Sequence, residues 1–393
     1  MSGAKRGQGR AKGLTTRARA TTRIMFVPCG QCKLCGRHKG VTYSPSSSAS
    51  SRGISCKSKA CQCGGKTPCG CQEGQCTFSR HYAEKSSAKG FLKQDKVVFT
   101  PSLPAADIRF GCVTEESGAI RAQLPDGVMG LGSEEISVHN QLVAQGIIDD
   151  VFSICMGSFR GGGALVLGHV EVDPSVRRRT IFAHLLSQRR GRQIHYEMEL
   201  KSVKIGERQV NFPRRQHGAM MGAIVDTGTT FTYLPAAQFN DFKTKLLAQL
   251  PPHIERNVVG PDPRFQDVCF GNAEFAKMEQ DFPAMTLQLR GVKQRTVEIE
   301  LSPQNYLFLH TRRANAFCLG MFNNGNQRPL LGAITFRQVL IQFDKKRKQV
   351  GLVRTNCARV GSIFSSGLGG TDGARDPAAR KVHAEGGEKG APG

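Results

Sequence analysis

A carboxylate on a tight loop between two apolar runs constrains this chain more than any other feature of its sequence. Residues 224–235 read Ile-Val-Asp-Thr-Gly-Thr-Thr-Phe-Thr-Tyr-Leu-Pro. The pattern predicts Asp226 at the end of a buried strand, because Gly228 lets the backbone bend where a side chain would clash. The hydroxyls of Thr227 and Thr229 can hydrogen-bond the loop and the carboxylate. Since Asp, Thr and Gly are also ordinary turn residues, the tripeptide alone favours a plain strand-turn-strand, and the residues that flank it decide otherwise.

The residues around this loop resemble those of a known family. Apolar residues before the Asp-Thr-Gly, and Phe-Thr-Tyr-Leu-Pro after it, resemble the surroundings of the second catalytic aspartate in pepsin-like aspartic proteases. Asp-Gly followed by an apolar-apolar-Gly element at Gly130 resembles the family's first signature crossing strand, and a second such element ends at Gly332. The resemblance spans residues 24–357 and is similar to the plant-type, cysteine-rich branch that includes nepenthesin.

The resemblance implies an all-β fold with two related lobes and a central substrate cleft. It places an N-terminal lobe, with a cysteine-rich insert and a flap, over residues 24–185, and a C-terminal lobe with Asp226 over residues 190–357. Residues 1–23 then form a basic segment that is disordered or misassigned, and residues 358–393 form a disordered tail. Composition agrees, because short Val, Ile, Phe and Thr runs separated by Gly and Pro are typical of strands.

The chain contains fourteen cysteines, and nine of them lie between Cys29 and Cys76. We predict a disulfide-stapled insert there rather than zinc, because Cys61-Gln-Cys63 and Cys69-Gly-Cys71 lack the two-residue gap of regular zinc clusters. No metal and no cofactor are expected. The even, high count favours the secretory pathway, the vacuole or the extracellular space. The chloroplast is the alternative, since the basic residues 1–23 also resemble a transit peptide and no apolar signal follows Met1.

The resemblance also assigns individual positions. The flap tyrosine, which closes over the substrate, would be Tyr82, before the tip of a long hairpin over residues 77–99; an ordinary half-buried surface tyrosine is the alternative. The implied disulfides are Cys269 with Cys318, Cys155 with Cys357, and Cys35 with Cys112. Cysteine spacing alone leaves the connectivity open.

The net charge of +24 raises the question of an acidic partner. The basic residues of the first 23 positions lie among Gly, Ala and Thr, as in a solvated tail, and no zinc-finger, basic-zipper or RNA-recognition signature occurs in the sequence. We therefore expect no specific nucleic acid. Protein or peptide substrates, a monomer and no membrane span are expected, because no window of about 18 apolar residues occurs.

An internal repeat locates the first catalytic position. Phe26-Val27-Pro28 aligns with Tyr233-Leu234-Pro235, and Asp226 lies eight residues before Leu234. The corresponding residue is Arg19, and residues 19–22 read Arg-Ala-Thr-Thr where the family has Asp-Thr-Gly-Ser. The predicted activity is therefore that of an aspartic endopeptidase with an acidic optimum, in a chain that is inactive as it stands.

Two explanations for Arg19 follow. The abrupt change at Ile24 from featureless basic sequence to family-like sequence favours a wrong exon or start choice, with an active protease encoded by the gene. Alternatively, the chain is a genuine non-catalytic homologue, similar to the xylanase inhibitors of the same fold family, which lack the full dyad and bind other proteins. In that case Arg19 beside Asp226 would form a salt bridge and leave no proton to share.

Overall fold

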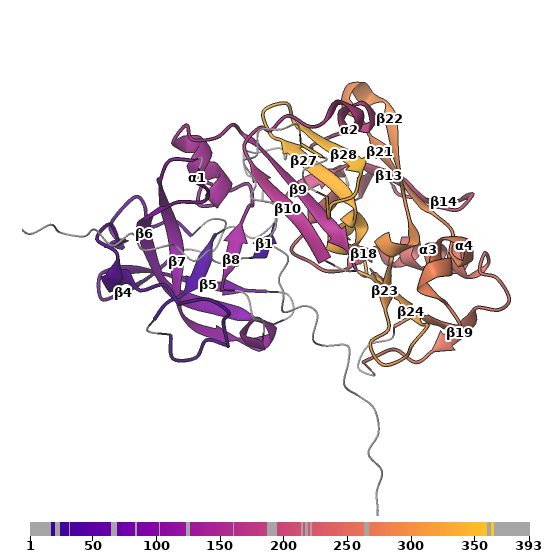
Figure 1. The fold of residues 1–393 in the computed structure, drawn as a ribbon, viewed down its shortest axis with the longest axis horizontal. Coiled ribbons are helices and arrows are strands. Elements are labelled where there is room, and N and C mark those ends of the chain that lie inside the picture. The colour runs from indigo at the N-terminus through magenta and orange to yellow at the C-terminus, as the bar shows by residue number, and fades with distance from the viewer. Residues whose placement is uncertain are drawn as a thin grey trace, which may run out of the picture.

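The fold was obtained as a computed structural model of the 393-residue chain. It describes residues 17–19, 24–30, 32–63, 69–82, 85–101, 103–122, 126–159, 161–186, 195–213, 215–216, 219–220, 222–262, 267–359 and 363–364. Strands dominate, and Figure 1 shows them in two halves that lie side by side, with a further sheet between them. The expected all-β, bilobal fold is confirmed.

The N-terminal half is one eight-stranded sheet in the order β1-β8-β2-β7-β6-β5-β4, with β3 paired to β6. Its strands are β1 (Arg17–Arg19), β2 (Phe26–Pro28), β3 (Arg52–Gly53), β4 (Gly70–Gln72), β5 (Gln75–His81), β6 (Ser87–Val97), β7 (Ala106–Ser117) and β8 (Val128–Gly130).

The C-terminal half contains three sheets of four or five strands and the short pair β15-β16. The strand orders are β12-β17-β26-β18-β25, β14-β13-β21-β22 and β19-β20-β24-β23. These strands are β12 (Tyr196–Met198), β13 (Leu200–Ile205), β14 (Arg208–Asn211), β15 (Arg215–Gln216), β16 (Ala219–Met220), β17 (Ala223–Asp226), β18 (Thr232–Leu234), β19 (Glu255–Val258), β20 (Cys269–Gly271), β21 (Met285–Arg290), β22 (Thr296–Leu301), β23 (Leu307–Leu309), β24 (Phe317–Leu319), β25 (Met321–Asn323) and β26 (Leu330–Gly332).

A middle sheet combines three strands from residues 151–184 with two strands from residues 339–354, in the order β10-β9-β27-β28-β11. Its strands are β9 (Val151–Ser158), β10 (Gly161–Leu167), β11 (Ile181–His184), β27 (Val339–Asp344) and β28 (Gln349–Arg354). β9 runs antiparallel to β27, with Ile154 opposite Ile341. The two halves therefore share backbone hydrogen bonds and are not merely packed together.

Helices are few and short in the described part of the chain. They are α1 (Val138–Ala144), α2 (Pro174–Arg179), α3 (Ala236–Leu247) and α4 (Met278–Asp281), with 3-10 turns at η1 (Pro45–Ser47), η2 (Gly118–Ala122), η3 (Phe275–Lys277), η4 (Val292–Gln294), η5 (Pro303–Asn305) and η6 (Ala333–Phe336). Phe239, Phe242, Leu246, Leu247 and Leu250 recur at helical spacing in the sequence, a pattern that predicts a helix over residues 236–250. α3 forms there and buries Phe242 and Leu246. No described helix has the length and apolar character needed to span a membrane.

Two segments expected to be disordered contain ordered residues. Residues 17–19 form β1 and pair in parallel with β8. At the other end, Ile363 and Phe364 are buried against Val176, Leu340 and the Cys155–Cys357 disulfide. These two apolar side chains cover one side of the middle sheet, which the Gly/Ala-rich composition of the tail does not reveal. The rest of both predicted tails lies largely outside the described residues.

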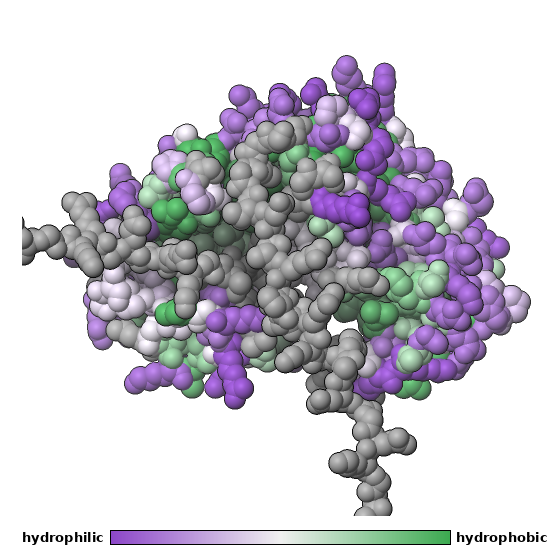
Figure 2. Space-filling model, in the orientation of Figure 1, coloured by the Kyte–Doolittle hydropathy of each residue, from purple (hydrophilic) through white to green (hydrophobic). Residues whose placement is uncertain are grey.

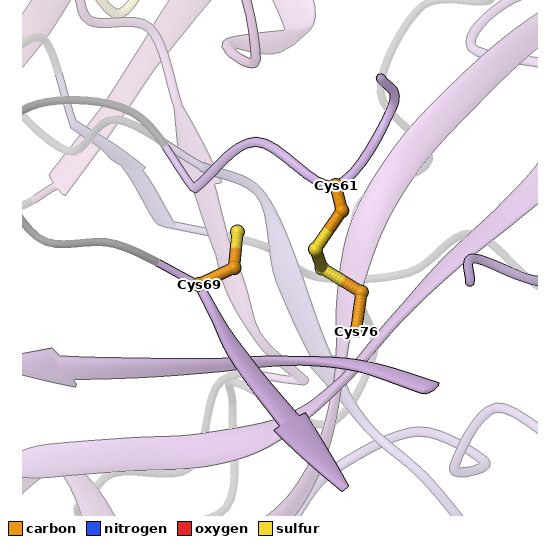
Figure 3. Close-up of side chains that lie close together, drawn as sticks. All are labelled: Cys61, Cys69 and Cys76. Carbon is orange, nitrogen blue, oxygen red and sulfur yellow. A yellow bond between two sulfur atoms is a disulfide. The ribbon is translucent and has the colours of Figure 1, made fainter. Parts of the chain in front are cut away.

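All fourteen cysteines form disulfides, so the disulfide-stapled insert is confirmed. The expected bonds Cys269–Cys318 and Cys155–Cys357 are present. The bonds in and beside the insert are Cys29–Cys112, Cys32–Cys35, Cys56–Cys71, Cys61–Cys76 and Cys63–Cys69. Figure 3 shows Cys69 beside the Cys61–Cys76 bond, and the sulfur atoms of these three residues lie within 4.8 Å of one another.

The expected bond between Cys35 and Cys112 is wrong. β2 runs parallel to β7 with Val27 opposite Cys112, so Cys29 lies directly beside this strand and its Cα is 5.4 Å from that of Cys112. Cys35 instead closes a short turn with Cys32, with their Cα atoms 5.6 Å apart. Strand pairing, which sequence spacing does not specify, decides the partner.

A buried polar bridge links the N-terminal half to the middle sheet. His139 on α1 is fully buried, and its Nε2 lies 2.8 Å from Asp150 Oδ1. Lys345, in the turn between β27 and β28, approaches the same oxygen at 2.8 Å. Burial lowers the pKa of His139. The hydrogen bond from His139 and the nearby Lys345 together lower the pKa of Asp150 to about 2.

We expect this bridge to make the protein lose stability in acid. Both pKa values are lower in the folded than in the unfolded chain, so the unfolded chain binds more protons as the pH falls. Protonation linked to His139 lowers the free energy of unfolding as the pH falls below 6.5, the ordinary pKa of histidine, by at most about 1.4 kcal/mol per pH unit. Protonation of Asp150 lowers it further between pH 3.8 and about 2. Urea unfolding of the H139Q variant, which keeps a donor for Asp150, should show a flatter pH dependence between pH 6.5 and 5.

The matched control is H253Q. His253 pairs with Asp281 at 3.0 Å, but its side chain is 57% exposed. It measures how far a His-to-Gln change at an exposed position alters the slope, and H139Q is judged against it. An unchanged slope in H139Q would contradict the assignment of the acid sensitivity to His139.

The long disulfide across the middle sheet should stabilise the fold more than the short one in the insert. Cys155 and Cys357 are 202 residues apart, whereas Cys32 and Cys35 are 3 apart. Loop-closure entropy predicts a loss of about 5 kcal/mol for C155A/C357A and about 2 kcal/mol for C32A/C35A. Denaturant unfolding of both variants measures the difference, and equal losses would count against the entropic account.

Candidate active site

Asp226 stands at the end of β17, inside the central sheet of the C-terminal half. β17 lies between β12 and β26, and its residues Ala223 and Val225 are fully buried. Asp226 as a whole residue is 8% exposed. Its Oδ1 accepts the backbone N–H of Gly228 at 2.8 Å, and its Oδ2 accepts the Thr229 hydroxyl at 2.7 Å. Both oxygens are therefore oriented by the loop that follows.

This loop is held against β26 and η6 by the backbone. The N–H of Ala333 donates to the Thr229 carbonyl at 2.7 Å, and that of Ile334 donates to the Thr230 carbonyl at 2.9 Å. Gly332 allows this approach, because a Cβ there would collide with the Phe231 carbonyl. The apolar-apolar-Gly element is thus the support on which the Asp226 loop rests.

A buried side-chain network strengthens the same support. The hydroxyls of Thr232 and Thr335 lie 2.5 Å apart, and Thr232 Oγ1 also accepts the N–H of Gly332 at 3.1 Å. Asn305 donates to the carbonyl oxygens of Thr335 and Arg337 at 3.0 and 2.7 Å. Sequence reasoning missed this network. Thr232 belongs to the Phe-Thr-Tyr-Leu-Pro motif, but Asn305 and Thr335 lie in no pattern that would have identified them.

The N-terminal half repeats the backbone arrangement. β17 pairs in parallel with β26, with Asp226 opposite Gly332. β1 pairs in parallel with β8, with Arg19 opposite Gly130. Residues 20–22 of the expected motif lie outside the described residues. The backbone of Arg19 thus has the same register in its half as that of Asp226 in the other.

The next strands extend this correspondence. Tyr233 of β18 lies opposite Leu330, and Phe26 of β2 lies opposite Val128. A Cβ on Gly130 would come within 2.7 Å of the Ile24 backbone, much as one on Gly332 would meet Phe231. The repeat found by aligning Phe26 with Tyr233 therefore has a structural counterpart.

Tyr82 follows β5 directly, at the tip of the hairpin that β5 forms with β6. Its backbone N–H donates to the Ser86 carbonyl at 2.9 Å, and its side chain packs against the hydrophobic cluster of the N-terminal half. The return strand β6 begins at Ser87, within the hairpin predicted over residues 77–99. Ser86 and Ser87 tie the hairpin to the next segment through Ile120 N–H and the Ser117 hydroxyl, at 3.2 and 2.7 Å.

Three groups of His, Cys and Glu side chains in the described residues are compact enough to share an ion. They are Cys61, Cys69 and Cys76; Cys269, His310 and Cys318; and Cys35, His38 and Glu116. Every cysteine in these groups is in a disulfide, whose sulfur lacks the thiolate charge that binds zinc. Asp226 belongs to none of them.

The paired lobes, and a carboxylate on a loop braced by an apolar-apolar-Gly strand, define the fold class of acid proteases. Residues 20–169 match the family model for the N-terminal part of xylanase inhibitors, and residues 195–354 match the model for their C-terminal part. The chain belongs to the plant-type branch of the pepsin-like aspartic protease family.

Individual relatives are distant but match most of the chain. Aspartic proteinase 36 of Arabidopsis thaliana is 25% identical over 366 residues, covering 85% of this chain and 69% of that protein. Nepenthesin-2 of Nepenthes gracilis is 24% identical over 350 residues, covering 85% and 72%. The crystal structure of basic 7S globulin from soybean superposes with a TM-score of 0.62 at 21% identity, covering 88% and 92%, which shows the shared fold.

The support under Asp226 predicts a strong effect of one added methyl group. In G332A the new Cβ would push the Phe231 carbonyl away and loosen the loop, so we expect a loss of about 3 kcal/mol in stability. Gly30 is the control, because its nearest neighbours for a Cβ lie at 3.8 Å. Thermal unfolding of G332A and G30A checks this, and equal melting temperatures would contradict the proposed support.

Proposed function

We propose that the chain has the scaffold of an aspartic endopeptidase, with Asp226 as the second catalytic aspartate and the Arg19 position as the first. In its present sequence it binds peptide segments in the cleft between the lobes without hydrolysing them. The observation that carries this proposal is the common backbone register of the Arg19–Gly130 and Asp226–Gly332 pairs.

Hydrolysis by this class of site needs two carboxylates that share a proton. The ionised carboxylate takes a proton from water as it attacks the scissile carbonyl, and the protonated one donates a hydrogen bond to the carbonyl oxygen. Asp226 can fill one of these roles, and Thr227, Gly228 and Thr229 form the loop that orients it. A guanidinium at position 19 cannot fill the other, because it stays protonated and accepts no hydrogen bond.

Tyr82 is our candidate for the flap residue over the bound peptide. Its place at the tip of the β5–β6 hairpin supports this role. Seven disulfides support a compartment of the secretory pathway, the vacuole or the extracellular space. Proteins or peptides are the proposed ligands, and no cofactor is invoked.

A second candidate function is inhibition of a glycosidase by direct binding. The observation that favours it is the match of both halves to xylanase inhibitor models. This function needs no dyad, so Arg19 would not impair it. A stable complex with a xylanase, with loss of xylanase activity and no cleavage of either protein, would support this alternative.

Restoring the missing motif tests the first proposal. The variant R19D/A20T/T21G/T22S gives the N-terminal half the sequence Asp-Thr-Gly-Ser. We expect it to cleave unfolded protein at pH 3–5 in a pepstatin-sensitive manner, whereas the wild type shows at least about 1000-fold less activity, as expected when a catalytic group is absent. Cleavage is measured with a fluorogenic casein at several pH values.

Adding D226A to the restored variant is the control and should abolish the gained activity. Activity of the wild type that disappears in D226A alone would overturn the claim that Arg19 prevents catalysis. A restored variant that folds but stays inactive would contradict the assignment of position 19.

A further inference from the structure

A buried ion pair lies on the same face of the sheet as Asp226. Glu197 of β12 is directly opposite Ile224 of β17. Residues opposite each other in an antiparallel pair project to the same face, and residues two apart on a strand share a face. Because Ile224 and Asp226 are two apart on β17, Glu197 projects on the face that carries the Asp226 carboxylate.

Arg328 reaches this face from the segment just before β26. Its Nη1 donates to Glu197 Oε2 at 2.7 Å. The side chain of Glu197 is 4% exposed, whereas that of Arg328 is 37% exposed. The Arg328 carbonyl accepts the side-chain amide of Asn324 at 2.9 Å, which fixes the backbone at this point. The Glu197 carboxylate is therefore buried, whereas the Arg328 guanidinium is partly exposed to solvent.

Such a guanidinium is ready to bind a carboxylate. Arginine has five N–H donors in a planar fork, and two parallel donors match the two oxygens of a carboxylate. The bond to Glu197 occupies Nη1 and holds the side chain in one orientation. Because the side chain is already ordered, it loses less conformational entropy when a ligand binds, which favours binding.

The spacing relates this cation to the proposed catalytic centre. Gly332 lies opposite Asp226, and Arg328 precedes it by four residues. At about 3.3 Å per residue, this separation is about 13 Å along the strand, the length of about four residues of an extended peptide. A peptide extended over Asp226 can thus bring a side chain to Arg328 within that span.

We infer that Arg328, positioned by Glu197, selects peptide segments with an acidic residue within about four positions of the residue over Asp226. This inference rests on the proposed function, because it requires that the cleft binds a peptide. It goes beyond that function by naming the charge of the preferred ligand. The acidic side chain forms a two-pronged hydrogen bond to the exposed edge of the guanidinium.

The test uses fluorescein-labelled octapeptides of the sequence Ala-Val-Val-Phe-Phe-Val-Val-Ala, with Glu or Gln substituted at each position in turn. Binding to the full chain is measured by fluorescence anisotropy at pH 6 and low salt. At one or two adjacent positions Glu should bind about five- to tenfold more tightly than Gln, the range for a charge-assisted hydrogen bond that is partly exposed. The preference should shrink in 1 M NaCl, because salt screens exposed charges.

Two variants connect the preference to Arg328. R328M should bind Glu and Gln peptides equally. E197Q/R328M should do the same without leaving a buried, unpaired carboxylate, so it remains informative where R328M folds poorly. R313M is the matched control, since Arg313 is 42% exposed and pairs with Glu255 in a different sheet. It should keep the wild-type preference.

The outcomes separate this inference from the proposed function. If the wild type binds the peptides but never prefers Glu, the inference fails and the proposed function stands. If the preference survives in R328M or E197Q/R328M, Arg328 is not its source. If no peptide binds to the wild type or to the restored R19D/A20T/T21G/T22S variant, the proposed function fails and this inference fails with it.

Discussion

The contact between the Asp226 loop and the glycine of the strand behind it is the constraint on which the rest of the site depends. The loop turns back so tightly that its carbonyl oxygens at Thr229 and Thr230 accept N–H groups from Ala333 and Ile334. Only a residue without a side chain at position 332 permits this approach. The orientation of both carboxylate oxygens follows, because Gly228 and Thr229 can reach Asp226 only from a loop held in this shape.

The two halves share this backbone plan but differ in the side chains that support it. In the C-terminal half, Thr232 and Thr335 add a buried hydrogen bond. By the alignment of Phe26 with Tyr233, the position of Thr232 is taken by Met25, which has no hydroxyl. Close backbone packing at the glycine, Gly130 or Gly332, is common to the two halves. The Thr232–Thr335 hydrogen bond supports the half that carries Asp226.

Local patterns predicted much of this fold. Short segments contain the apolar run before Asp226 and the helical spacing of Phe242 and Leu246, so both could be predicted locally. The Cys269–Cys318 disulfide followed from the resemblance to the family. In the case of Cys35 the prediction failed, because parallel pairing of β2 with β7 puts Cys29 nearer to Cys112. Arg328 and Glu197 are 131 residues apart, so no sequence pattern joined them. Contacts of this kind depend on tertiary structure, which the chain specifies only as a whole.

The middle sheet has a consequence for the order in which the chain can fold. β9 pairs with β27, which begins only at Val339. Cys155 likewise forms its disulfide with Cys357, 202 residues later in the sequence. On a ribosome, chain segments fold as they emerge, from the N-terminus onward. The first lobe therefore leaves one edge of β9 and the Cys155 thiol without their partners until Val339 and Cys357 have been synthesised. Throughout that interval the nascent chain exposes a strand edge and a thiol that can pair wrongly.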